Sequence, residues 1–218
     1  MKTILTTLLA ILITGMTYAG NYEVAMQKAL TQLNEADSPE AFTSTAQAFD
    51  RIGKVEEGEW LPQYYAAFCY IRAAFAEGDV AIREKHLNQA MVHVEAGLEN
   101  EDNSELQTLL GYAKMGQITV DPMTRGPQLT PEVMQALGKA IQMNPENPRA
   151  YMVMGQMKLG TARFFGKGEE EACGYITRAL ELFGTEEVPE GSMQPAWGQH
   201  YTTQLAGTCT EILAEKGQ

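Results

Sequence analysis

Three arginines stand beside aromatic or turn-forming residues and are the side chains best suited to hold an anionic ligand. Arg125 lies in the segment DPMTRG, Arg149 at the start of an expected helix, and Arg163 directly before Phe164 and Phe165. A guanidinium group can bind a carboxylate or phosphate through two parallel hydrogen bonds. The alternative is a structural role, in which these arginines cap helix ends and pair with acidic side chains. The chain has 28 acidic and 16 basic residues, so acidic partners are abundant. The sequence favours this structural role and leaves the anion site as the alternative.

Other residue types with chemical potential do not form a catalytic or metal-binding pattern. His86 and His93 are seven residues apart, whereas two histidines on a helix must usually be three or four apart to hold one zinc ion. His200 has no such neighbour, and Met152 and Met154 point to different faces of one helix. No carboxylate pair has a spacing that a glycosidase would require, and no serine lies in a nucleophile elbow. We therefore expect no catalytic residue, no metal and no cofactor.

The first residues have the pattern of a secretory signal. MKTILTTLLAILITGMTYAG has one cation, an apolar run of about a dozen residues and a small-residue ending at Ala19. That run is shorter than the roughly 20 apolar residues of a membrane helix. We expect residues 1–19 to be removed and residues 20–218 to form a single domain. The protein should then lie in the periplasm or cell envelope, with the extracellular space as an alternative, and the mature chain has no candidate transmembrane segment.

Charge and cysteine content narrow the classes of partner. The formal net charge is -12, which argues against nucleic acid as a partner, because phosphate backbones require a basic surface. Of the three cysteines, Cys69 lies in the apolar run AAFCYI and is expected to be buried. Cys173 and Cys209 lie in the last two expected helices and are the preferred disulfide pair, with three free thiols as the alternative.

The elements that would position these residues are all expected to be helices, because apolar residues recur at helical spacing and no alternating strand pattern occurs. Proline after a capping residue marks three helix starts, at Pro39, Pro131 and Pro148. Between the helices we expect two long loops, 118–130 and 162–168, which would cover the alternative anion site. The expected helices are 22–35, 39–54, 60–77, 80–99, 104–117, 131–143, 148–165, 168–183 and 199–216.

The segment from 131 to 183 has the spacing of a helical hairpin repeat. Gly155 follows Tyr151 by four residues, and Ala172 precedes Ile176 by four, so large and small side chains could interlock between two helices. The pattern resembles the tetratricopeptide repeat family. The whole chain, including NPENPRAYMVMGQMKLGTARFFG and EACGYITRALELF, also resembles small exported helical-repeat proteins of Bacteroidetes. These resemblances imply an all-α fold, an irregular tetratricopeptide-like stack of hairpins with a C-terminal helix.

In a stack of this kind the first helix of each hairpin lines the concave face. The side chains expected there are aromatic, methionine, amide and arginine groups, which suit a peptide or a partner protein: Tyr64, Phe68, Tyr112, Arg149, Met152 and Gln156. Trp60 and Trp197 each adjoin an expected helix start, where a hydrophobic staple is typical. The sequence therefore predicts a non-catalytic module that binds a protein or peptide, or serves as a scaffold, in the cell envelope. The alternatives are an enzyme or small-anion-binding protein with a site under the two loops, and a self-associating structural subunit.

Overall fold

The computed structural model describes residues 21–216, and within this range every regular element is an α-helix. The predicted signal peptide, residues 1–19, lies outside the described residues. The all-α prediction is confirmed, and most predicted boundaries agree with the observed ones within two residues. A helix over residues 21–35 comes first, and the others follow in this order: α2 (Pro39–Val55), α3 (Trp60–Ala76), α4 (Val80–Asn100), α5 (Ser104–Val120), α6 (Pro122–Met143), α7 (Pro148–Phe165), α8 (Glu169–Thr185) and α9 (Gln199–Lys216).

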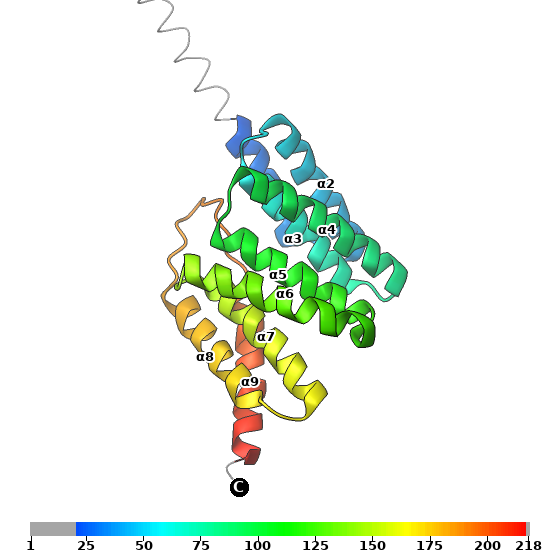
Figure 1. Ribbon diagram of the computed structural model, residues 1–218. Helices are drawn as coiled ribbons and strands as arrows, with labels where there is room; N and C mark the ends of the chain where they lie inside the picture. Colours follow the sequence, from blue (N-terminus) through cyan, green and yellow to red (C-terminus); the bar gives the residue numbers. More distant parts are fainter. Residues whose placement is uncertain (1–20, 217–218) are drawn as a thin grey trace, which may run out of the picture.

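The helices form a stack of antiparallel pairs (Figure 1). α3 packs on α4, α5 on α6 and α7 on α8, while α3, α5 and α7 also contact one another in that order. α9 follows a long non-helical segment and packs on α8. The sequence sets these contacts through glycines on one helix that face large side chains on the next. The first helices of three successive pairs therefore form one inner layer, which is the arrangement that the concave face requires.

Gly155 shows why the hairpin of α7 and α8 closes so tightly. A methyl group added at Gly155 would lie 2.6 Å from Cγ1 of Ile176 and 3.3 Å from the carbonyl oxygen of Ala172. Gly111 has the same role in the preceding hairpin, where an added methyl would lie 2.6 Å from Cγ of Leu137. The contact of residues 151–155 with residues 172–176 is the one that the repeat spacing predicts.

One predicted loop is wrong. Residues 118–130 are helical except for the turn at Asp121, because α5 continues to Val120 and α6 begins at Pro122 rather than at Pro131. Asp121 caps α6 by accepting a hydrogen bond from the backbone N–H of Thr124, so Asp121-Pro122 is the true start signal. Pro127 and Pro131 then lie inside the helix. They are four residues apart, so both missing N–H groups are on one side of α6.

A disulfide joins α8 to α9. Cys173 and Cys209 are bonded, with 5.4 Å between their Cα atoms, and they lie in a small apolar cluster with Leu159, Ala172 and Ile176. Cys69 is a free, buried thiol in α3. The bridge fixes the last helix to the hairpin before it, so α9 has a defined position beside α8.

Candidate functional site

The inner layer of α3, α5 and α7 presents the face expected to be concave, which we call the concave face, and the chain's own residues 186–198, which we call the strap, lie against it. This segment leaves α8, rises along one edge of the stack, turns back and ends where α9 begins (Figure 1). Two hydrogen bonds fix its middle: Gln27 Nε2 donates to the carbonyl oxygen of Gly191 at 2.7 Å, and the Tyr65 hydroxyl donates to that of Met193 at 2.8 Å. The strap therefore connects the last hairpin with the first helix of the stack.

Trp197, near the end of the strap, fills the middle of the concave face. Its ring stacks on Phe68 at 4.4 Å and on Tyr112 at 5.9 Å between ring centroids. Its indole N–H donates to the Tyr64 hydroxyl at 2.7 Å. The predicted staple role of Trp197 is wrong, because its ring packs on α3 and α5. The half-buried indole ring has aromatic contacts on both helices and a hydrogen-bond acceptor for its N–H group.

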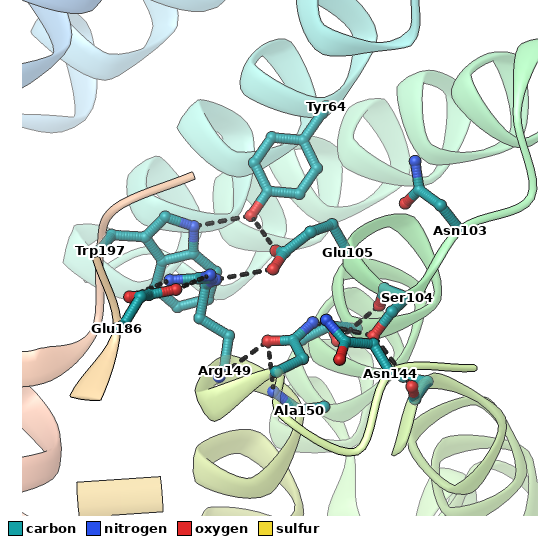
Figure 2. A network of polar contacts seen from close by, with 12 residues as sticks. Tyr64, Asn103, Ser104, Glu105, Asn144, Arg149, Ala150, Glu186 and Trp197 are labelled. Carbon is teal, nitrogen blue, oxygen red and sulfur yellow. Dashed lines mark hydrogen bonds and ion pairs between the residues drawn. The ribbon is translucent and has the colours of Figure 1, made fainter. Parts of the chain in front are cut away.

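A buried polar network lies beside this ring (Figure 2). The Tyr64 hydroxyl donates to Oε2 of Glu105 at 2.8 Å, and Arg149 Nε donates to Oε1 of the same carboxylate at 2.8 Å. The other end of the guanidinium donates two hydrogen bonds to Glu186, the first residue of the strap. Arg149 thus lies between a carboxylate from α5 and a carboxylate from the strap.

Burial sets the electrostatics of this network. The side chain of Arg149 is 5% exposed and that of Glu105 15% exposed. Burial raises the pKa of the Glu105 carboxyl, and Arg149 and Tyr64 oppose that rise. Burial disfavours the charged guanidinium, but the two carboxylates more than compensate and raise the pKa of Arg149 above its usual range. Two carboxylates bound to one buried guanidinium form a structural clamp on the strap.

The five predicted site residues other than the arginines fall into three groups. Tyr64, Phe68 and Met152 are buried, with exposures of 0%, 3% and 1%, beneath the strap and its neighbours. Gln156 is half-buried on α7, and its Oε1 has no hydrogen-bond partner among residues 21–216. Tyr112 is in contact with Trp197. A peptide from outside would meet the strap at Tyr64, Phe68, Tyr112 and Met152, each of which contacts Trp197 or lies beside Gly198.

The three arginines do not converge. Arg125 forms an ion pair with Glu84 of α4, and Arg149 belongs to the buried network. Arg163 lies fourteen residues further along α7 than Arg149, which is about 21 Å at 1.5 Å per residue. The structure therefore does not assemble the anion site that the alternative placed under the two loops.

Part of the concave face stays open beyond Trp197, and sequence reasoning missed most of its residues. We call it the Arg72 face, made of Arg72, Phe75, Tyr112 and Tyr201. Phe75 is 38% and Tyr201 39% exposed, and the Phe75 and Tyr112 rings are 5.2 Å apart. A signal was present for Arg72, which follows the predicted concave residue Phe68 by one helical turn. No sequence signal marked Tyr201, because its position depends on the path of the strap.

Two shallow clefts lie away from this face. One, of about 340 Å³, is formed between the first helix and α2 and has Lys28 and Arg51 on its walls; the other, of about 360 Å³, lies between α2 and α4 and includes Glu40, Glu77 and His86. Among residues 21–216 no group of three potential ligands could hold a metal ion. Within the same range none of the helices combines the length and apolarity that crossing a bilayer requires.

Comparisons with known proteins give one informative similarity. No family model and no curated protein matches the chain. Among solved structures, the chain is similar to the HusA haemophore from Porphyromonas gingivalis, with a TM-score of 0.77 and 26% sequence identity. The match covers 88% of this chain and 94% of the haemophore. The similarity thus extends over nearly the whole stack, including most of the described helices.

Proposed function

We propose that this protein is an exported, non-catalytic carrier that binds haem or a related porphyrin. The observation that carries the proposal is the similarity to a haemophore over almost the full length of both chains, with 26% of residues identical. The predicted signal at residues 1–19 fits such a role, because a carrier of an external ligand must leave the cytoplasm.

The chemistry of the concave face supports this ligand class. Phe68, Tyr112 and Trp197 form a parallel aromatic stack, and the neighbouring rings of Phe75 and Tyr201 are partly exposed. A porphyrin is a flat, largely apolar ring system, which gains most from contact with exposed aromatic faces. The described residues offer no cluster that would be expected to perform catalysis on it.

Peptide binding is a weaker proposal for the same face. The strap already lies across Tyr64, Phe68 and Met152 and uses Glu186 and Trp197 as anchors. An external peptide would have to displace these contacts, including a buried ion pair. Self-association is a separate alternative, and measurement of the mass of the mature chain in solution would decide it.

The test is titration of purified residues 20–218 with haemin. We expect a shift of the haemin absorption band and quenching of tryptophan fluorescence, saturating at one ligand per chain. Trp197 is close to the open part of the concave face, so energy transfer to the ligand should be efficient. An unchanged haemin spectrum and unquenched fluorescence at saturating concentrations would refute the proposal.

A further inference from the structure

Within the described range 21–216, Arg72 has no acidic partner, although the protein as a whole is acidic. Its guanidinium carbon lies 4.6 Å from the centroid of the Phe42 ring and 5.8 Å from that of Phe68. The side chain is exposed, and no carboxylate among residues 21–216 comes within ion-pair distance of it. Although the chain has 28 acidic residues, the contacts that hold the exposed Arg72 side chain within residues 21–216 are those with the Phe42 and Phe68 rings.

This packing leaves the hydrogen-bonding groups of Arg72 available. A guanidinium over a phenyl ring contacts it through its flat face, so its N–H groups point sideways and stay free for an acceptor. The ring contact also orders the side chain before a ligand arrives, which lowers the entropy cost of binding. Arg72 is therefore preorganised for a planar two-oxygen acceptor such as a carboxylate.

Phe75 follows Arg72 by three residues on α3, so the two side chains lie on the same side of that helix. Burial is the main reason that the pKa of the Tyr112 hydroxyl is raised; the nearby Tyr201 adds to the rise, and the positive charge of Arg72 opposes it. Contact between the Phe75 and Tyr112 rings, at 5.2 Å, extends the aromatic surface to the exposed edge. Arg72 thus lies near a surface of three rings from α3, α5 and α9, and the positive charge of Arg163 on α7 acts on the Tyr201 end of that surface.

We propose that the Arg72 face is the ligand site, and that it selects flat apolar rings bearing a free carboxylate. The ring system would lie on Phe75 and Tyr201, and one ligand carboxylate would accept two hydrogen bonds from Arg72. The proposal rests on the proposed porphyrin-carrier function and adds the location of the site and the ligand group that it recognises. It requires no metal, because both contacts are made to the organic ring and its side chains.

The experiment compares protoporphyrin IX, which has two free carboxyl groups, with its dimethyl ester. We expect the wild-type protein to bind the acid at least about tenfold more tightly, the usual effect of a hydrogen bond to a charged group. Arg72→Gln should lower the affinity for the acid to that for the ester and leave ester binding unchanged. Phe75→Ala should weaken both ligands, because it removes ring contact alone.

Arg51→Gln is the matched control, since Arg51 is also exposed but lines the cleft between the first helix and α2. It should change neither affinity. Equal binding of acid and ester by wild type, or loss of acid preference in Arg51→Gln instead of Arg72→Gln, would overturn the Arg72 site while leaving porphyrin binding intact. Failure of both porphyrins to bind would overturn the proposed function, and the site with it. Circular dichroism of each variant shows whether the fold is kept.

Discussion

Arg149 illustrates how a residue suited to ligand binding can be used for structure instead. It lies at the start of α7, with its side chain 5% exposed, and donates hydrogen bonds to Glu105 and Glu186. A buried guanidinium that is paired on both sides has no free donor directed at a ligand. Arg72, by contrast, is exposed and has no carboxylate partner among the described residues, so its donors are free for a ligand. The difference lies in their surroundings, since both are arginines on the inner layer of helices.

Replacing Arg149 should therefore destabilise the protein strongly. In Arg149→Met, Glu105 is left buried without its cation, and we expect a loss of about 3 to 5 kcal/mol in the free energy of unfolding. Denaturant titration followed by circular dichroism would measure it. Lys139→Met is the control, because Lys139 and its partner Asp102 are 45% and 49% exposed, and its loss should cost less than about 1 kcal/mol. Similar stabilities for the two variants would contradict the assignment.

The buried Glu105 predicts a pH dependence with a defined sign. Burial raises the pKa of its carboxyl in the folded protein, so the folded state binds the proton more strongly than the unfolded state. The contribution of this group to stability is then full below the unfolded-state pKa near about 4.3 and is lost as pH rises through the folded value. Wild type should gain stability relative to Glu105→Gln as pH falls from neutral towards that value. A relative loss on acidification would show that the ion pair with Arg149 outweighs burial.

At the scale of the helices, local signals predicted most of the structure but not the start of α6. Ser38-Pro39 and Asn147-Pro148 cap α2 and α7 as expected. Thr130-Pro131 has the same form, yet it lies inside a helix that Asp121-Pro122 begins. Proline at the first helical position and proline within a helix give the same local sequence pattern. Packing of α6 on α5 decides between them, and that contact is not visible in the residues around Pro131.

The close approach of α7 and α8 gives a test of the hairpin. Gly155→Leu places a side chain where even a methyl group would lie 2.6 Å from Ile176, and we expect a loss of about 1 to 3 kcal/mol or more from overpacking. Gly160→Ala on the same helix is the control, because an added methyl there has no neighbour within 4 Å. It should be neutral or raise stability by up to about 1 kcal/mol. Melting temperatures of the two variants measure the difference, and an unchanged Gly155→Leu melting temperature would contradict the packing.

The disulfide between α8 and α9 can be tested by mass analysis. Intact-mass analysis under non-reducing conditions should find a single Cys173–Cys209 bridge and one alkylatable thiol, Cys69, after unfolding. Reduction should lower stability by about 2 to 5 kcal/mol, because the bridge closes a loop of 36 residues. Three alkylatable thiols in the unreduced protein would rule the bridge out.

For the whole molecule, the strap is the feature that sequence patterns could not predict. Residues 186–198 have no helical periodicity, and the partners of the segment lie as far as 164 residues away, as in the hydrogen bond from Gln27 to Gly191. Helical spacing assigned Tyr64, Phe68 and Tyr112 to their correct helices, but their exposure depends on Trp197. Local spacing predicts which residues share a helix face, and the tertiary path decides which of them a ligand can reach.

Trp197 should couple the two ends of the stack during unfolding. Wild type should unfold in one transition. In Trp197→Ala the first and last hairpins should unfold in two separate transitions. Trp60 is then the only tryptophan, so its fluorescence reports on α3 while circular dichroism reports on every helix. Different denaturation midpoints from the two probes are expected for Trp197→Ala, with coincident midpoints for Phe164→Ala, which alters an exposed ring. Coincident midpoints in both variants would show that the strap does not link the ends.

The strap also limits how the length of this stack can change during evolution. Helical arrays commonly gain or lose whole hairpins, because each one contacts only its neighbours. Here Gly191, bonded to Gln27 of the first helix, comes only five positions after Glu186, which is paired with Arg149 of α7. Five steps along the chain span at most about 18 Å. An inserted hairpin would move these anchors apart by roughly the 8 to 10 Å between packed helices. A relative with one more hairpin would need a longer connection before α9, or would lose one of the anchors.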